Sequence, residues 1–221
     1  MGGVYAELGA YYTDQRVADA IAANLPIREG DSVLEGHAGG GAILSAFLAL
    51  PRKLDLYAMD VDPRCPAMTA PAPRYHRRVQ SFLGEPVICT RPDTGQDVVA
   101  QTADPYPDDW PRPTWIVGNP PYGVRVPGRK SAFPVAHHHV RRALELTGRH
   151  VVLLLRAGFA TATSYVHLLT GDNTPRELWF LFPRPGFAGA GTDMAAYVVI
   201  WWDRQHDGPC TVRWIGWKGP A

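Results

Sequence analysis

An asparagine, two prolines and a tyrosine directly follow an apolar run in the stretch WIVGNPPYGVR, Trp115 to Arg125. The side-chain oxygen of Asn119 and the carbonyl of Pro120 are two acceptors that can bind both protons of a planar amino group. Such binding favours a pyramidal nitrogen and frees its lone pair for attack on an electrophile. Prolines restrict the backbone that holds these acceptors, and Tyr122 offers a ring for an aromatic partner to stack on. We therefore assign a catalytic role to Asn119, Pro120, Pro121 and Tyr122.

A glycine-rich turn in LEGHAGGG, Leu34 to Gly41, joins an acidic residue to an apolar helix. Glycine lets a backbone approach a ligand, and open α/β sheets bind ligands at the carboxyl ends of their strands. Asp60 follows roughly twenty residues later at the end of the next strand, where a partner for a ribose hydroxyl is expected. These features favour an adenosine-containing cofactor over a flexible turn with a solvated aspartate. The sequence contains neither GxGxxG nor GxxxxGK[ST], which disfavours a nicotinamide enzyme or a nucleotide hydrolase.

The remaining pattern predicts elements that hold these residues in an open α/β sheet, because strands and helices alternate along most of the chain. Val17, Ile21 and Leu25 share one face of a predicted helix, which Thr13 caps and Pro26 ends. A short strand at 33–35 precedes the glycine turn, and a second apolar helix begins at residue 42. Further strands are expected in KLDLYAMDVDP, PVICT, DVVAQTAD, TWIVG and HVVLLLRAGF.

The last part of the chain predicts two more strands, ELWFLFPRP and AAYVVIWWD, which form an antiparallel pair that closes the sheet. A helix in FPVAHHHVRRALELTG precedes them, and Val135, His139 and Leu144 belong to the region that faces the sheet. The three consecutive histidines of this helix point in directions about 100° apart, so we expect no metal site there.

Composition excludes several classes of protein. The 221 residues suggest one domain, and 22 Lys+Arg against 21 Asp+Glu leave a formal charge of +1, without the strongly basic balance of a general polyanion binder. Three distant cysteines offer no disulfide framework, which fits a reducing compartment. The N-terminus does not resemble a signal peptide, and no apolar run approaches the roughly 20 residues that cross a bilayer. We expect a cytoplasmic protein of a bacterial or phage-infected cell with no membrane contact.

NPPY at the end of a central strand resembles motif IV of the class I S-adenosylmethionine-dependent methyltransferases that act on planar amino nitrogens. GAYYTDQRVA resembles the N-terminal cofactor-binding motif of the amino-methylating DNA enzymes, VLEGHAGGGAIL their motif I, AMDVDP their motif II and TADPY their motif III. FPRPGFAGAGTDMAAYVVIWWD resembles the final hairpin of small phage-type adenine methyltransferases, and the motifs follow the gamma order. The resemblance implies a class I methyltransferase (Rossmann-like) mixed sheet with a C-terminal antiparallel hairpin. We expect residues 1–221 to form this single catalytic domain without a separate target-recognition domain.

Some positions depart from the family pattern. His37 stands in motif I where the family usually has proline or serine, and Gly40 stands where a hydroxyl residue is common. Asp14 replaces the commoner proline of the N-terminal motif, a change that suits the positive end of a helix.

The resemblance also implies which residues hold S-adenosylmethionine, the expected cofactor. They are Tyr11, Tyr12, Thr13, Glu35, Gly36, His37, Gly39, Gly41, Asp60, Val61, Asp104, Pro105 and Asn119. Phe187 is the candidate for a second aromatic wall of the base pocket, with a core position as the alternative. Arg125, Arg129 and Lys130 follow the catalytic strand in a loop that either binds nucleic-acid phosphates or is simply solvated.

The sequence and the resemblance together predict methylation of the exocyclic amino group of adenine in DNA, with base flipping and a low or short sequence specificity. An RNA adenine or protein glutamine methyltransferase is an alternative, since NPPY also occurs in such enzymes. A second alternative is a non-catalytic protein that binds cofactor and nucleic acid. A protein partner that supplies specificity is compatible with the sequence, and the oligomeric state is left open.

Overall fold

The computed structural model describes residues 12–71, 74–83, 86–90, 97–101, 106–124, 133–186 and 195–217. Its helices are α2 (Gln15–Asn24), α3 (Ala42–Leu48), α4 (Pro66–Thr69), α5 (Ala136–Leu146) and the 3-10 turns η1 (Ala157–Thr161), η2 (Thr163–Leu168) and η3 (Gly171–Asn173). Its strands are β1 (Ser32–Glu35), β2 (Asp55–Asp60), β3 (His76–Val79), β4 (Pro86–Thr90), β5 (Asp97–Gln101), β6 (Trp115–Gly118), β7 (Gly123–Val124), β8 (Phe133–Pro134), β9 (His150–Arg156), β10 (Glu177–Phe182), β11 (Tyr197–Asp203) and β12 (Thr211–Gly216). Among these described residues, no helix has the length and apolar character needed to span a membrane.

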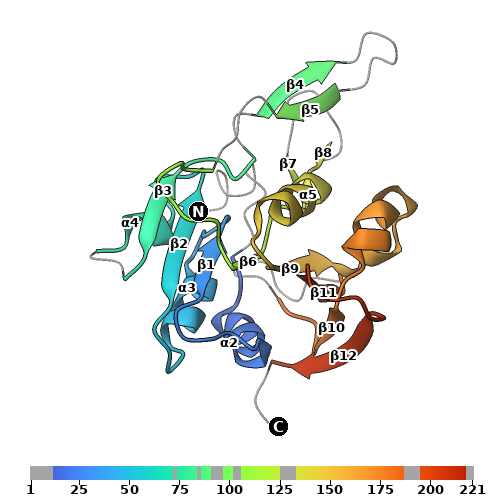
Figure 1. Cartoon of the computed structure of the whole chain (residues 1–221). Helices are drawn as coiled ribbons and strands as arrows, with labels where there is room; N and C mark the ends of the chain where they lie inside the picture. Colours follow the sequence, from blue (N-terminus) through green and yellow to red (C-terminus); the bar gives the residue numbers. More distant parts are fainter. Residues whose placement is uncertain are drawn as a thin grey trace.

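The central feature is an eight-stranded mixed sheet in the order β12-β10-β11-β9-β6-β1-β2-β3 (Figure 1). The strands β3, β2, β1, β6 and β9 run parallel to one another. Strand β11 is antiparallel to both of its neighbours, β9 and β10. The predicted open α/β sheet with a C-terminal antiparallel pair is therefore confirmed.

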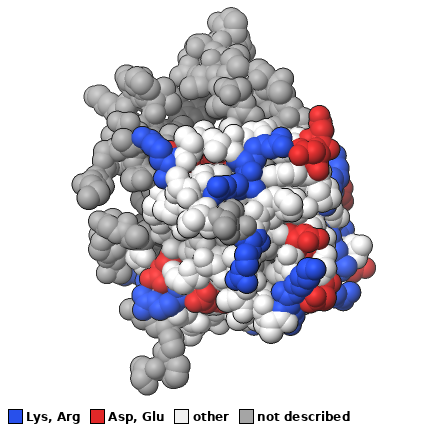
Figure 2. All heavy atoms as spheres, turned by 90° about the vertical axis from the view of Figure 1, so that its left-hand side faces the viewer, with Lys and Arg blue, Asp and Glu red and all other residues white. Residues whose placement is uncertain are grey.

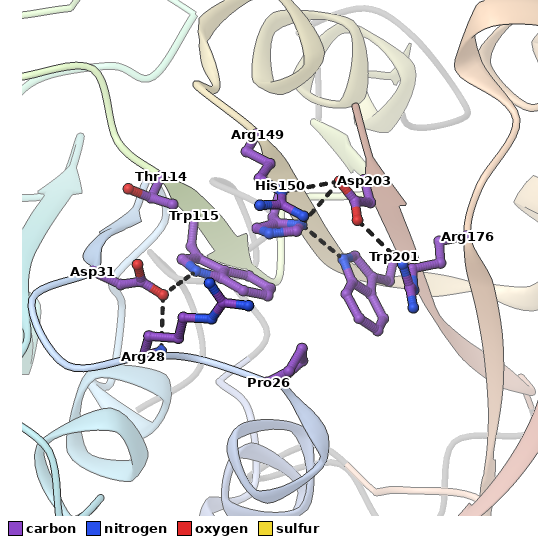
Figure 3. A pocket seen from close by; sticks show the side chains of 10 residues that line it. All are labelled: Pro26, Arg28, Asp31, Thr114, Trp115, Arg149, His150, Arg176, Trp201 and Asp203. Carbon is purple, nitrogen blue, oxygen red and sulfur yellow. Dashed lines mark hydrogen bonds and ion pairs between the residues drawn. The ribbon is translucent and has the colours of Figure 1, made fainter. Parts of the chain in front are cut away.

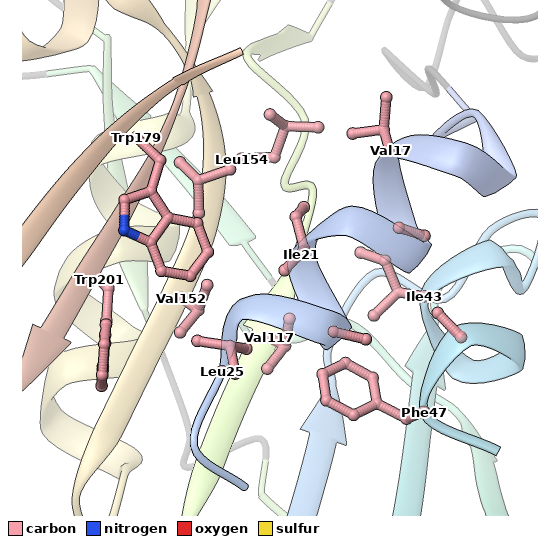
Figure 4. Close-up of a cluster of buried hydrophobic side chains, with 14 of the residues drawn as sticks. Val17, Ile21, Leu25, Ile43, Phe47, Val117, Val152, Leu154, Trp179 and Trp201 are labelled. Atoms are coloured by element: carbon pink, nitrogen blue, oxygen red, sulfur yellow. The ribbon is translucent and has the colours of Figure 1, made fainter. Parts of the chain in front are cut away.

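Helices cover both faces of this sheet (Figure 1). The central strands have apolar side chains on both of their faces, and each face packs against different helices. Val152 and Leu154 of β9 pack in one buried cluster with α2 and α3, whereas Val151, Leu153 and Leu155 pack in another with α5. Successive side chains of a strand point to opposite faces, so a strand covered on both sides is apolar at every position. Figure 4 shows the first cluster, in which the apolar faces of α2 and α3 lie against the sheet.

The N-cap of helix α2 lies one residue after Thr13, the residue predicted to cap it. The N-cap is Asp14, whose carboxylate accepts a hydrogen bond from the backbone N–H of Arg16. The prediction that Thr13 caps this helix is therefore wrong. The helix ends at Asn24, because Leu25 precedes Pro26 and adopts the extended conformation that a following proline imposes.

The predicted antiparallel pair does not close the sheet. Strand β12 lies parallel to β10 on its outer side, so β10 is an interior strand and β12 forms the edge. This strand lacks an alternation of buried and exposed residues, because residues 211–214 are all exposed and only Ile215 of the strand is buried. The segments PVICT and DVVAQTAD do form strands, but β4 and β5 pair in a separate two-stranded sheet.

Candidate active site

Three polar residues meet at the carboxyl edge of the parallel strands. Strand β1 lies between β2 and β6, so Glu35 at its end is flanked by Asp60 at the end of β2 and by Asn119 just after β6. Strand β2, the next in sequence, lies on one side of β1, and the later strand β6 lies on the other. Open α/β sheets bind ligands at such a switch point.

The glycine turn after β1 is held against the end of β2. The backbone N–H of Gly39 donates to Oδ2 of Asp60 at 2.8 Å, and the N–H of Ala38 donates to the carbonyl of Met59 at 2.9 Å. Gly41 caps helix α3 with a φ of 80°, a left-handed conformation that favours glycine. The Asp60 carboxylate therefore holds the backbone of the predicted cofactor loop against the end of β2.

Asp60 and Val61 differ in their burial and polarity at the end of β2. Burial raises the pKa of Asp60, and the N–H groups of Asp62 and Gly39 that donate to its carboxylate offset part of this effect. Val61 is 58% exposed at the same strand end and so offers an apolar surface beside the carboxylate. An acceptor next to an apolar surface matches the expected contacts of a nucleoside.

Glu35 is buried with an unused acceptor. Glu35 is 3% exposed and accepts a hydrogen bond from the backbone N–H of Leu44, but its Oε2 atom has no hydrogen-bond partner among the residues that the structure describes. Burial raises the pKa of this carboxyl group well above its ordinary value, and the charge of Asp60 adds to the effect. A buried oxygen without a partner costs free energy, which a cationic or donor group of a ligand can recover.

A narrow cavity of about 20 Å³ brings together six of the ten predicted cofactor residues that the structure describes. These six residues come from the start of the described chain, the end of β1 with its glycine turn, and the end of β6: Tyr12, Thr13, Glu35, His37, Gly39 and Asn119. The Tyr12 ring lies over the glycine turn, since a Cβ placed on Gly39 would lie 3.1 Å from it. Sequence-distant motifs thus form one site.

Asn119 is held at both ends of its amide. Its Nδ2 donates to Oγ1 of Thr13 at 3.2 Å, and its Oδ1 accepts a hydrogen bond from the Tyr122 hydroxyl at 2.5 Å. Thr13 therefore positions Asn119 instead of capping a helix. An amide oxygen has two lone pairs, so Oδ1 can accept a second hydrogen bond while Tyr122 holds it.

The ring of Tyr122 is half-buried between the two core clusters of the sheet. The Cζ atom of Arg156 lies 5.4 Å from its centroid, and the ring of Tyr197 lies 5.9 Å away. Arg156 was not predicted as a site residue. It is a charged residue at the end of the apolar strand β9, and a charged residue at a strand end is the signal that identified Asp60. Pro120 is buried and Pro121 half-buried beside them.

Comparison with known proteins gives structural matches alone: no family model and no curated protein matches the sequence. A protein assigned as a class I S-adenosylmethionine-dependent methyltransferase from Listeria monocytogenes matches with a TM-score of 0.60, 9% identity and coverage of 90% of this chain and 62% of that one. A protein assigned as a modification subunit of a type I restriction enzyme from Vibrio vulnificus YJ016 matches with a TM-score of 0.60, 14% identity and coverage of 96% and 48%. The 23S rRNA methyltransferase ErmE matches with a TM-score of 0.56, 18% identity and coverage of 90% and 71%.

The chain has the class I methyltransferase fold. It spans less than two thirds of the first two of these proteins, 62% and 48% of their lengths. At identities of 9% to 18% the likeness concerns the fold alone.

A buried histidine pair supports the glycine turn of this methyltransferase fold. Nε2 of His37 lies 2.7 Å from Nδ1 of His139 on α5, and burial lowers the pKa of His37 to about 3. The edge of Phe82 packs against both His37 and Gly36, where an added Cβ would meet that ring at 2.4 Å. His139 was predicted only as a sheet-facing residue. Its polar side chain on an otherwise apolar helix face was the available signal.

Several predicted site residues lie outside the described residues: Tyr11, Asp104, Pro105, Arg125, Arg129, Lys130 and Phe187. Four predicted cofactor residues belong to the turn and strand end described above but do not line the cavity: Gly36, Gly41, Asp60 and Val61. On the face of the methyltransferase fold shown in Figure 2, basic and acidic side chains of the described residues are interspersed. This mixture agrees with the formal charge of +1.

Proposed function

We propose that this chain is an S-adenosylmethionine-dependent methyltransferase that acts on the exocyclic amino group of adenine in DNA. One observation carries the proposal: the amide of Asn119 and the unpartnered carboxylate oxygen of Glu35 line one cavity with the glycine turn. An amine-activating acceptor and a cofactor-type loop thereby share a site.

The residues around the cavity fit the cofactor. When bound, S-adenosylmethionine supplies an electrophilic methyl group. The free Oε2 of Glu35 offers an acceptor for a cationic group, and the glycine turn admits a ligand close to its backbone. Asp60 and the exposed Val61 offer a hydroxyl partner and an apolar surface at the end of β2.

Asn119 and Pro120 would act on the amine that receives the methyl group. Asn119 Oδ1 and the Pro120 carbonyl accept hydrogen bonds from its two N–H groups, which favours the pyramidal nitrogen of the transition state. After methyl transfer, the cationic nitrogen releases one proton to solvent. Tyr122 holds the Asn119 oxygen in place through its hydroxyl group. No base with a shifted pKa is needed, because the acceptors are neutral groups with fixed positions.

An adenine within a duplex cannot reach such a site unless it flips out of the stack. The proteins with this fold include a modification subunit of a restriction enzyme and an rRNA methyltransferase, so they do not choose between DNA and RNA. DNA is proposed because the order and type of the motifs resemble the small adenine-methylating DNA enzymes. RNA adenine and protein glutamine are the competing substrates, and a non-catalytic binding protein is the competing role.

The test incubates the protein and cofactor separately with duplex DNA, single-stranded DNA, ribosomal RNA and a glutamine-containing protein extract. Mass spectrometry of the nucleosides and peptides identifies the product, and N6-methyladenine from DNA is expected. Sequencing the methylated positions then measures specificity, which we expect to be low or limited to a short motif. Methylation of RNA or protein alone would select a competing substrate, and cofactor binding without any product would select the non-catalytic role.

Asn119→Ala is expected to lower turnover on DNA by about 100-fold or more, the typical loss for one fixed transition-state contact. Its affinity for S-adenosylmethionine, measured by calorimetry, should stay within a few-fold of the unchanged protein because the lost acceptor faces the amine. Asn173→Ala is the matched control, since Asn173 lies in η3 and does not line the cavity. Near-normal turnover in Asn119→Ala would refute the proposed mechanism.

A further inference from the structure

A second cavity, of about 260 Å³, lies at the opposite edge of the sheet from the candidate active site (Figure 3). Asp31 stands just before β1, Trp115 begins β6 and His150 begins β9, so the cavity is at the amino ends of these parallel strands. The antiparallel strand β11 brings Asp203 to the same edge from its carboxyl end. Its volume is close to the lower end of the roughly 300 to 1,000 Å³ typical of small-molecule sites.

Both carboxylates of the cavity are already bound by fixed donors. Oδ2 of Asp31 accepts from the Trp115 indole N–H at 2.8 Å and from the backbone N–H of Arg28 at 2.9 Å. Asp203 is 5% exposed and is bound by two guanidinium groups, from Arg149 and Arg176, each at 3.3 Å. Neither carboxylate depends on a ligand for its partners.

The arginines, in contrast, retain unused donors. Each guanidinium has five N–H groups, and Arg149 places only part of its donors on Asp203. Arg176 donates to Asp203, lies 4.0 Å from Oε1 of Glu177 and stacks over the Trp201 ring, which still leaves part of its donors unused. The side chain of Arg28 makes no ion pair with any residue in the described part of the chain, while its backbone forms the turn to Asp31. Figure 3 shows Arg28 on one side of the cavity and the other two arginines around Asp203 on the other.

His150 adds a further donor at the floor. Its ring stacks on Trp115 with centroids 3.8 Å apart, and its Nδ1 accepts the indole N–H of Trp201 at 3.4 Å. Burial lowers the pKa of His150 to about 4, so the ring is neutral near pH 7. Nδ1 also lies 3.6 Å from Oδ1 of Asp203, and a neutral imidazole has one N–H group to donate.

With three guanidinium groups, two carboxylates and a neutral histidine, the cavity carries one net positive charge and an excess of donors. We propose that it binds the phosphoryl group of a small phosphorylated molecule. Guanidinium groups that approach from separate sides suit a tetrahedral group with three free oxygens better than a planar carboxylate with two. Trp115, Trp201 and Pro26 provide apolar walls around this group.

Calorimetry with inorganic phosphate and with ribose 5-phosphate at low ionic strength tests the site, with acetate at equal ionic strength as the planar anion. Binding of both phosphate compounds, and weaker binding of acetate, is expected. Tighter binding of ribose 5-phosphate than of inorganic phosphate would identify an organic phosphate as the source, and equal binding would identify free phosphate. Absence of phosphate binding, or equal affinity for acetate, would overturn the proposal.

Arg28→Gln is expected to weaken phosphate binding about tenfold or more, the worth of one charge-assisted hydrogen bond. Because this side chain has no described ion pair, the variant should remain folded, which circular dichroism checks. Arg52→Gln removes the same charge from an exposed site away from the cavity and should bind phosphate normally. Equal loss in both variants would show a general charge effect, and no loss in Arg28→Gln would show that Arg28 does not contact phosphate; either result would contradict the site. Asn119→Ala should bind phosphate normally, so this result does not depend on the proposed methylation.

Discussion

Tyr122 contributes a hydroxyl group as well as a ring to the candidate active site. The sequence pattern led us to expect a stacking surface, and the structure adds the 2.5 Å contact to Asn119 Oδ1. The ring itself is half-buried against the core and lies beside Arg156. The tyrosine therefore positions the asparagine whether or not a base stacks on it.

Tyr122→Phe separates these two contributions, because it removes the hydroxyl group and keeps the ring. We expect turnover to fall by about fivefold to tenfold, the effect of one neutral hydrogen bond, with unchanged cofactor affinity. Tyr165→Phe is the matched control, since Tyr165 lies in η2 away from the cavity. Steady-state kinetics on DNA gives the answer, and full turnover in Tyr122→Phe would show that Asn119 needs no such support.

At the scale of elements, helix α2 links the core to the candidate active site. Its buried face, with Val17 and Ile21, packs against α3 and the sheet, and Figure 4 shows Ile21 in this cluster. The segment just before it carries Thr13, which holds the Asn119 amide. Packing of one helix thus sets the position of a cavity residue.

Ile21→Ala should lower the free energy of unfolding by about 2 to 4 kcal/mol, because it removes a buried side chain and leaves a cavity. Urea unfolding followed by circular dichroism measures this change. Asp19→Ala, on the exposed side of the same helix, is the control and should change the free energy by about 0.5 kcal/mol or less. A loss below about 1 kcal/mol in Ile21→Ala would contradict the packing assigned to α2.

At the scale of the whole molecule, the two edges of the sheet have different chemistry. The carboxyl edge holds acceptors, with Glu35, Asp60 and Asn119, whereas the amino edge holds an excess of guanidinium donors. The carboxyl edge also contains a buried histidine pair, His37 of the glycine turn and His139 of α5. Burial lowers the pKa of His37 from 6.5 to about 3, and the pKa of His139 also falls well below its ordinary value.

These two histidines make stability depend on pH. The unfolded chain binds their protons near pH 6.5, whereas the folded chain binds them only at much lower pH, so stability falls as the pH decreases from 6.5 toward 3. Glu35 has a raised pKa and acts in the opposite sense, so the comparison must be made between variants.

The double variant His37→Ala and His139→Leu should show a smaller loss of unfolding free energy between pH 6.5 and pH 4 than the unchanged protein. Urea unfolding at several pH values measures the slope. His76→Ala is the control, because His76 is exposed on β3. An equal slope in the double variant and the unchanged protein would show that the buried pair does not account for the acid sensitivity.

The sequence by itself determined the local features of this protein. Periodic apolar residues predicted α2, the central strands and α5, and polar residues at strand ends predicted Glu35, Asp60 and Asn119 as site residues. These features depend on the two-residue period of strands and the 3.6-residue period of helices, which a short segment contains in full. The identity of the helix cap was less certain, because Thr13 and Asp14 are both good caps and only backbone conformation chooses between them.

Only the tertiary structure decided which distant residues meet. Thr13 and Asn119 are 106 positions apart, and His37 and His139 are 102 apart, so no local pattern could pair them. The 260 Å³ cavity at the amino edge is formed by loops and strand ends of separate segments. Strand β12 is at the edge of the sheet because it pairs with the outer side of β10. The order and register of the strands decide such contacts, because they place side chains from separate segments at the same edge of the sheet. The alternation of side chains along a single strand, which the sequence shows, determines only the face of the sheet on which each side chain lies.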